Sequence, residues 1–539
     1  EISGSGLPCN PELLADERCF GGVARRATVL KEIRERDSGN ENIIFLDTGD
    51  QFQGTDWFYF YKGNATAHFM NLLGYDAMGL AKSEFLRDVP GLVPFLEQIE
   101  FPAVSSNINT SNEPSMQPLL SRSHVITVGG EKVGVVGVTK PETPDLAMTG
   151  NLIFEPVIES VQAAVDALVD DHGVNKIIAL SDSSFEIDQE IARSVQGVDI
   201  VIGGHPYTFL YTGDPPYDEE AKTGDYPLII HPSYNESLDI LVVSAYLFGK
   251  YLGYLEVTFD DEGAVTSYAG NPIVLDKDVA KDPEVLAEVE AWKVLVDATS
   301  NTVVGSADVE LVGSLSVCGV GECSMGSMLT DSMRFAHGMG WDVDIAITST
   351  GSFASSIDQG NITISDLTRT IPYGDTIDLL ELTGESIIAI LEKSVTGFET
   401  SSASTAFLQL SGAVVEYDLT HENGDRVLSV KLPCDSCDDG YEAIDVETVY
   451  HVAMNSYISG GQEGYTIILE STISRERGSL DVDVAVSYLN DFSPIMASTS
   501  ARIVIYDEEN RPNASTMLTA PSLGVLLLVF LGSMMAFKI

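Results

Sequence analysis

The sequence contains few basic residues for its length. Its 539 residues include 29 lysines and arginines but 81 aspartates and glutamates, which gives a formal net charge of −52 at pH 7. Such a charge repels nucleic acids and anionic membrane surfaces, so both are excluded as partners. The sequence also lacks a calcium-binding loop of the D-x-D-x-D-G type. The acidic residues are spread along the chain and are expected to form a solvated surface.

Cysteine is also scarce, and its six residues form three closely spaced pairs: Cys9 with Cys19, Cys318 with Cys323, and Cys434 with Cys437. Local disulfides explain this spacing. The C-x-x-C spacing of the last pair also occurs in redox and zinc sites, but no second C-x-x-C and no paired histidines accompany it. Five N-x-S/T sequons occur, at Asn64, Asn109, Asn235, Asn361 and Asn513. Disulfides and sequons together predict a glycoprotein of the secretory pathway.

Long apolar runs are absent except near the end of the chain. Residues 518–537 carry no charge, and the sequence ends two residues later. Small residues at 513–515 and a short spacer precede this run, which is the pattern of a glycosylphosphatidylinositol (GPI) attachment signal. A transmembrane helix is the alternative. The sequence therefore predicts a GPI signal and hydrophobic tail over 509–539, and a protein on the extracellular face of the plasma membrane or secreted.

The rest of the chain is too long for one hydrophobic core, so two domains are expected. In the first half, apolar runs typical of strands alternate with helical patterns, which predicts an α/β fold. The expected strands are 42–46, 132–138, 176–180 and 199–202, and the expected helices are 157–170 and 187–195. The second half has expected strands at 343–347, 413–417, 427–432 and 449–454, and a helix at 385–394. The predicted domains cover 1–277 and 302–508, and a helix at 282–298 lies in the linker 278–301.

Four short loops follow expected strands, which is where α/β proteins place ligands. The loops are 45–54, 80–85, 180–185 and 203–208, and they contain Asp50, Lys82, Asp182 and His205. Single aspartates and histidines at strand ends also form turns. These loops alone therefore do not establish a metal site.

Characteristic stretches run in order through nearly the whole chain. They include Gly-Asp-Gln-Phe-Gln-Gly at 49–54, Ser-Asn-Ile at 106–108, Gly-Gly-His at 203–205, Gly-Lys-Tyr-Leu-Gly at 249–253, and Phe-Leu-Gln-Leu-Ser-Gly at 407–412. In these stretches the chain resembles the 5′-nucleotidase family, which also includes apyrases. The resemblance implies an α/β (α+β) protein. Its N-terminal domain would be a metallophosphatase-type four-layer α/β/β/α sandwich, and its C-terminal 5′-nucleotidase-type α/β domain would hold the nucleoside.

The family's catalytic motif is altered. Where the family has Gly-Asn-His-Glu-Phe-Asp, this chain has Ala-Lys-Ser-Glu-Phe-Leu at 81–86. By the resemblance, Lys82 replaces a metal-binding Asn, Ser83 replaces the catalytic His, and Leu86 replaces the carboxylate partner of that His. The family's Asp-x-His is expected before the Cys9 region, and the given sequence opens at Glu1, either by processing or by truncation. We therefore predict that no intact catalytic residue remains.

The metal ligands implied by the resemblance are only partly kept. Asp50 and His205 persist, and Asp182 replaces a ligand His but could still bind a cation. An ammonium about 4 Å from a divalent ion is repelled by roughly 8 kcal/mol at an effective dielectric constant of 20. We therefore predict that Lys82 replaces a metal ion and pairs with Asp50 and Asp182. The alternative is that Lys82 extends into solvent.

The nucleoside-binding residues implied by the resemblance are also reduced. Ser349 and Ala354 stand where the family has an Asn and an Arg, and Gly319 stands where it has another Arg. Phe407 and Tyr465 keep an aromatic pair that can stack on a purine, with about 1–3 kcal/mol per stack. This predicts weak nucleoside or nucleotide binding, roughly millimolar to high micromolar. The alternative is that both rings are packed in the core.

These changes predict a catalytically inactive cell-surface protein that acts by binding, with no cofactor and an unknown protein partner. The resemblance also implies a homodimer. One alternative is an active extracellular 5′-nucleotidase or apyrase that uses two divalent, zinc-type metal ions. It would have to work without the catalytic His and the substrate arginines, each loss costing about tens- to thousands-fold in rate. A structural surface protein that binds calcium or a cationic partner is a further alternative.

Overall fold

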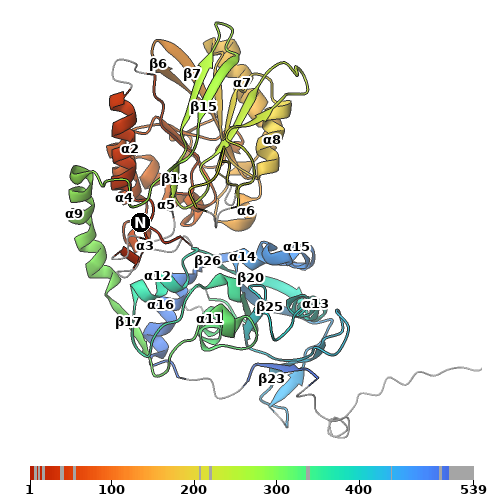
Figure 1. Ribbon diagram of the computed structural model, residues 1–539. Helices are drawn as coiled ribbons and strands as arrows, with labels where there is room; N and C mark the ends of the chain where they lie inside the picture. The colour runs from red at the N-terminus through yellow and green to blue at the C-terminus, as the bar shows by residue number, and fades with distance from the viewer. Residues whose placement is uncertain are drawn as a thin grey trace, which may run out of the picture.

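The chain folds into two α/β halves, and Figure 1 shows the first half above the second. The computed structural model describes residues 1–4, 9, 13–14, 18–36, 42–52, 56–204, 208–217, 221–335, 340–438, 440–496 and 501–508. His205, Asn513 and the predicted GPI signal lie outside these ranges. None of the helices within them has the length and apolar character needed to span a bilayer.

The first half contains two principal sheets. One has four parallel strands in the order β1 (Leu46–Asp47), β2 (Ala77–Gly79), β3 (Ala103–Val104) and β5 (Leu120–Ser121). The other has six strands in the order β11 (Leu228–Ile230), β12 (Ile240–Ser244), β10 (Ile200–Gly203), β9 (Ile177–Asp182), β7 (Glu131–Thr139) and β6 (Ser123–Val128). Its four inner strands are parallel, and its two edge strands are antiparallel. The parallel strands bring the loops that follow them to one edge.

Helices cover the outer face of each sheet. The first sheet is covered by α2 (Val23–Arg36), α4 (Gly63–Leu73) and α5 (Asp88–Leu96), and the second by α7 (Val157–His172) and α8 (Phe185–Ser194). Val135 of β7 faces the other sheet, whereas its neighbour Val136 packs against α7. Because both faces of β7 are buried, its sequence is a continuous apolar run. The predicted four-layer α/β/β/α sandwich is confirmed.

The strand expected at 42–46 is wrong in its extent. Only Leu46 and Asp47 form β1. The N–H of Phe45 instead donates to the Asp76 carboxylate at 2.7 Å, and the Phe45 ring stacks on Tyr75 with 3.8 Å between centroids. A side chain therefore takes the hydrogen bond that a longer strand would have used.

The second half follows the helix α9 (Pro283–Ser300), which runs along the side of the molecule between the halves (Figure 1). Asp282 caps this helix by accepting hydrogen bonds from the N–H groups of Glu284 and Val285, and Pro283 occupies its first turn. The main sheet has the order β21 (Leu408–Ser411), β18 (Ile345–Ser349), β25 (Val449–Asn455), β20 (Thr376–Thr383) and β26 (Ser474–Leu480). A smaller sheet has the order β24 (Tyr441–Ala443), β23 (Val427–Pro433), β22 (Val414–Asp418) and β27 (Ile503–Tyr506).

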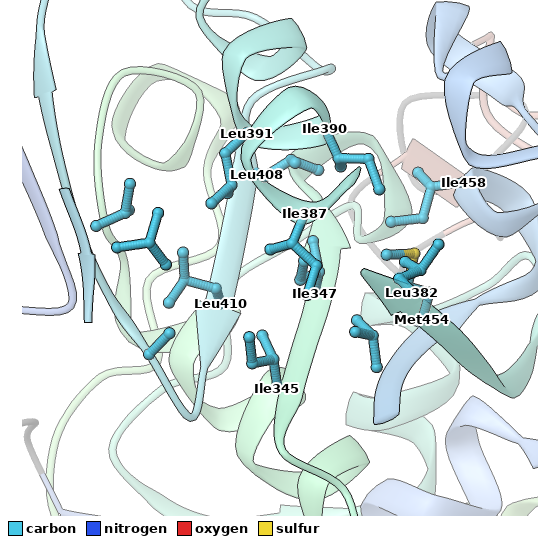
Figure 2. Packing of buried hydrophobic residues seen from close by; sticks show 14 of the residues in the cluster. Ile345, Ile347, Leu382, Ile387, Ile390, Leu391, Leu408, Leu410, Met454 and Ile458 are labelled. Carbon is cyan, nitrogen blue, oxygen red and sulfur yellow. The ribbon is translucent and has the colours of Figure 1, made fainter. Parts of the chain in front are cut away.

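The helix α13 (Gly384–Ser394) packs on the main sheet of the second half. Figure 2 shows Ile387 and Ile390 of this helix facing Ile347 of β18 and Leu382 of β20. Most residues of this cluster are shielded almost completely from solvent. This core holds the strand ends that carry the candidate nucleoside residues.

The cysteines form the three predicted disulfides, Cys9–Cys19, Cys318–Cys323 and Cys434–Cys437. Three predicted glycosylation sites, Asn64, Asn235 and Asn361, are exposed. Asn109 is half-buried, and its amide donates to Glu155 at 3.0 Å. Three of the four described sequons are therefore open to modification.

Candidate functional site

The candidate loops meet at one edge of the two sheets in the first half. They follow β1, β2, β9 and β10, as the sequence predicts. Gly204 N–H donates to Ser181 O at 2.7 Å, which joins the loop after β10 to the end of β9. Lys82 N–H donates to Asp182 Oδ2 at 3.3 Å, which joins the loop after β2 to the loop after β9. The two sheets thus contribute to one site.

Asp50 lies on a tight turn after β1. Gly49 has φ +106°, and a Cβ at this position would lie 2.7 Å from the N atom of Ala81, so only glycine fits. Asp50 itself has φ 63°, an uncommon conformation for a residue with a side chain. Its Oδ1 accepts a hydrogen bond from Ser83 N–H at 3.0 Å. The turn therefore directs the Asp50 carboxylate towards the loop after β2.

Glu84 is the residue of this site that the sequence analysis did not single out. Its carboxylate is fully buried and accepts hydrogen bonds from the N–H groups of Asp50, Gln51 and Ala81 at 3.0, 2.7 and 2.8 Å. Burial, and then the charge of Asp50, raise the pKa of Glu84. Glu84 is kept within the altered motif 81–86, and this retention is the sequence signal that points to it. Glu84 fixes the geometry of the two loops around it.

Asp182 is 8% exposed and lies beside these two carboxylates. Burial, and then the negative charges of Asp50 and Glu84, raise the pKa of Asp182 well above its usual range. Raised pKa values favour the protonated carboxyl groups, so burial and crowding at this sheet edge reduce the negative charge of the cluster.

Lys82 does not neutralise this cluster, so the predicted pairing is wrong. Its Nζ lies 4.0 Å from Oδ1 of Asp375, which belongs to the second half. Within the ranges that the structure describes, no ion pair joins Lys82 to Asp50 or Asp182. Lys82 precedes the short helix η1 (Ser83–Phe85), and its backbone faces Asp182 while its side chain crosses to the other half. The Lys82 side chain is 28% exposed, so the solvent alternative does not describe it either.

Ser83 and Leu86 are both fully buried. The Ser83 hydroxyl accepts a hydrogen bond from Phe52 N–H at 3.4 Å. Leu86 lines a small hollow between the halves with Arg87, Gly374 and Asp481. Neither the hydroxyl of Ser83 nor the aliphatic side chain of Leu86 can transfer protons near neutral pH.

The aromatic pair of the second half is also buried. Phe407 and Tyr465 both have 0% exposure. Phe407 stacks on Phe398 with 4.8 Å between ring centroids, and the Tyr465 hydroxyl donates to the carbonyl of Ala406. Neither ring offers a free face to a base in this structure, which agrees with the packed alternative.

The three positions at which the resemblance implies lost polar residues are Gly319, Ser349 and Ala354. Ser349 ends β18, and its hydroxyl lies 3.1 Å from that of Ser352. Gly319 ends the short helix α10 (Leu315–Cys318), and Ala354 N–H donates to Thr370 O at 2.7 Å. Glu463 lies beside Ser349 and was not singled out from the sequence. None of the three positions carries a charged side chain.

Comparison with known proteins shows similarity over most of the chain. The chain is 38% identical to 5′-nucleotidase from Bos taurus over 527 residues, which cover 95% of this chain and 90% of the relative. It is 40% identical to 5′-nucleotidase from Homo sapiens over 500 residues, which cover 90% of this chain and 86% of the relative. The chain belongs to the 5′-nucleotidase family.

Further similarities agree with this family. Residues 303–470 match the family model described as "5′-nucleotidase, C-terminal domain". The crystal structure of a 5′-nucleotidase precursor from Thermus thermophilus matches with a TM-score of 0.65 and 34% identity, covering 92% of this chain and 94% of that chain. Snake venom 5′-nucleotidase from Naja atra is 38% identical over 503 residues, which cover 90% of this chain and 93% of the relative.

The described residues do not fit the two-metal centre that the 5′-nucleotidase resemblance implies. Both Glu84 oxygens are bound by backbone N–H groups. In the described ranges, the one group of three potential ligands within 4.8 Å of one another is Cys434, Cys437 and Glu442, and its cysteines are joined as a disulfide. Asp50, Glu84 and Asp182 do not converge in this way. We therefore derive no catalytic step through a metal ion.

Proposed function

We propose that this 5′-nucleotidase-family protein is a catalytically inactive cell-surface protein that acts by binding. The observation that carries the proposal is the structure of 82–86, where the resemblance assigns a metal ligand, the catalytic His and its carboxylate partner. The chain instead has a lysine directed to the second half, a buried serine and a buried leucine. Lys82 and Leu86 lie against the second half, and none of the three residues supplies an acid or base for phosphoryl transfer.

The charge of Lys82 also restricts metal binding. Its backbone is hydrogen-bonded to Asp182, so the ammonium stays tethered within one side-chain length of the carboxylate cluster. A divalent ion about 4 Å from an ammonium meets roughly 8 kcal/mol of repulsion at an effective dielectric constant of 20. Because Lys82 Nζ lies beside Asp375, an active alternative with one metal ion, held by Asp50, Asp182 and His205, would meet this repulsion only if the lysine side chain turned back to the cluster.

The two halves keep the scaffold of the family. Lys82 with Asp375 and Arg87 with Asp483, at 3.4 Å, pair residues of the first half with residues of the second. Arg475 of the second half also donates to the carbonyl of Asp145 in the first half at 3.2 Å. A fold that makes these contacts between its halves without the catalytic groups is suited to binding a partner, here an unidentified protein, with nucleotide as a weak ligand.

Three features support an extracellular site of action. The described cysteines are all disulfide-bonded, and such bonds persist in oxidising compartments. Three sequons are exposed. A relative is a snake venom protein. We propose a GPI anchor attached through the signal at 509–539, and a homodimer as the assembled form.

The proposal is tested by phosphate release from AMP, ADP and ATP with zinc, manganese, magnesium and calcium. The protein is compared with a variant that carries Lys82→Asn, Ser83→His, Leu86→Asp and Asp182→His, and both retain the natural N-terminus. The expected result is no turnover by the unchanged protein with any metal. Metal-dependent turnover by the unchanged protein at a rate typical of enzymes, about 1–10³ per second, would overturn the proposal.

A further inference from the structure

Glu463 has a strained backbone conformation in the loop that carries Tyr465. It lies in the short helix η3 (Gln462–Gly464) with φ 55° and ψ 20°. This left-handed conformation is usual for glycine but costs energy for a residue with a side chain. The surrounding structure must therefore hold Glu463 in place.

The side chain of Glu463 lies against the loop after β18. A Cβ added at Gly351 would collide with Glu463 Oε1, so the carboxylate sits directly on this glycine. The same Cβ would lie 3.3 Å from Cβ of Thr405, which places Glu463 between two segments. The hydroxyls of Thr405 and Ser349 lie near the carboxylate and oppose, without overcoming, the effect of burial on the pKa of Glu463. Glu463 thus fills the space between 349–351 and Thr405.

The second oxygen of this carboxylate is buried without a partner. Oε2 of Glu463 has no hydrogen-bond partner within the described residues. Burial raises the pKa of Glu463. A buried oxygen that lacks a partner is unfavourable. Strain and an unsatisfied oxygen on one residue are typical of a functional position.

The segments that Glu463 joins are those around the aromatic pair. Thr350 N–H donates to Phe407 O at 2.9 Å, and Gly351 N–H donates to Thr405 O at 2.8 Å. Tyr465 follows Glu463 by two residues, and its hydroxyl binds the carbonyl of Ala406. Opening a gap between Phe407 and Tyr465 would move the loop 460–465 and withdraw Glu463 from Gly351.

We propose that Glu463 is an internal plug of the nucleoside pocket in the second half. Its side chain occupies the place next to Ser349 and Gly351, and it holds the loop 460–465, and with it Tyr465, closed over Phe407. The inference rests on the proposed function in taking this pocket as the nucleoside site of the family. It concerns nucleoside binding alone and is independent of phosphate release by the first half.

The test is calorimetric titration of the full protein with adenosine. Glu463→Ala removes the plug, and Glu463→Gln keeps its shape without the charge. Glu470→Ala makes the same charge change as Glu463→Ala at an exposed position of α15 (Thr466–Ser471). We expect Glu463→Ala to bind adenosine more tightly than the unchanged protein by about tenfold or more, the factor that one base stack contributes. The Gln and Glu470 variants should match the unchanged protein.

A second measurement distinguishes opening of the loop 460–465 from unfolding of the whole protein. Hydrogen–deuterium exchange of 460–465 should be faster in Glu463→Ala than in Glu463→Gln, while exchange in β18 and β25 stays the same. Addition of Tyr465→Ala to Glu463→Ala should abolish the gained binding. Unchanged adenosine affinity in a Glu463→Ala protein with normal exchange in β18 and β25 would overturn the inference, whether or not phosphate release is detected.

Discussion

At the scale of single residues, Lys82 has two different partners. Its N–H binds Asp182 in its own half, and its ammonium lies 4.0 Å from Asp375 in the other half. Asp375 is 2% exposed and also accepts hydrogen bonds from Ser456 and Asn455 at 2.9 and 3.2 Å. The lysine therefore compensates a buried carboxylate of the second half.

Removal of this cation should destabilise the protein. We expect Lys82→Met to lower the free energy of unfolding by about 1 kcal/mol, a small value because the lysine side chain is 28% exposed and the pair is long. Thermal unfolding should show a decrease in Tm of about 1–2 °C. Lys293→Met, which breaks an exposed pair with Asp297 within α9, serves as the control and should have a smaller effect.

A double-mutant cycle with Asp375→Asn then isolates the pair. The Tm changes of Lys82→Met and Asp375→Asn should not add up in the double variant, because each removes the same interaction. Strict additivity would contradict the contact between Lys82 and Asp375.

Asp188 should make stability depend on pH. This residue of α8 is 1% exposed, its Oδ1 has no partner in the described residues, and burial raises its pKa to about 7. Because its folded-state pKa lies above the unfolded value of about 3.9, the folded state loses stability as the pH rises from about 4 to about 7. Asp188→Asn stays neutral and should stabilise the protein at pH 8 by at most about 4 kcal/mol.

The measurement is Tm against pH for Asp188→Asn and for the control Asp170→Asn, an exposed residue of α7. The Tm gain of Asp188→Asn should be small near pH 4 and largest near pH 8, and the control should show little gain. An equal gain at both pH values would mean that Asp188 is ionised throughout.

At the scale of elements, the loop 460–465 carries the strain of Glu463. Glu463→Gly should raise the free energy of unfolding by about 1 kcal/mol, because glycine accepts the left-handed conformation and the unsatisfied oxygen disappears. The same substitution at Glu470 in α15 should lower it by about 1 kcal/mol, since glycine weakens a helix. Opposite Tm changes in the two variants are the expected result. A decrease in both would show that the left-handed backbone of Glu463 is not strained.

Most elements could be predicted from the sequence because their periodicity is strong. The helix α7 buries Val157, Val161 and Leu168 on one face, and the parallel strands β7, β9 and β10 are apolar over most of their length. The strand at 42–46 was wrong because a single side chain, Asp76, takes the hydrogen bond of Phe45. A side chain that replaces a backbone hydrogen-bond partner does not change the hydrophobic periodicity of the sequence.

The candidate site was predicted only in part. The four loops could be placed at one edge because parallel strands share their direction. The partner of Lys82 could not be found, since Asp375 lies 293 residues away and contacts it only through the packing of the halves. Glu463 was missed because its role depends on a left-handed turn that sequence spacing does not reveal.

At the scale of the whole molecule, two α/β halves are connected by α9 and by contacts across their interface (Figure 1). The altered motif 81–86 lies at this interface and contributes Lys82 and Leu86 to it. Two of the positions that the family resemblance assigns to the catalytic site, Lys82 and Leu86, therefore lie where the halves meet. We propose that the scaffold is kept for binding and that Glu463 closes the nucleoside pocket.

The most direct test of this account is the initial rate of phosphate release from AMP by the unchanged protein saturated with zinc. Bovine 5′-nucleotidase, 38% identical to this chain, is the positive control. We expect no phosphate release above background under conditions in which the control is active. Turnover by the unchanged protein at about 1 per second or faster, abolished by a chelator, would contradict it.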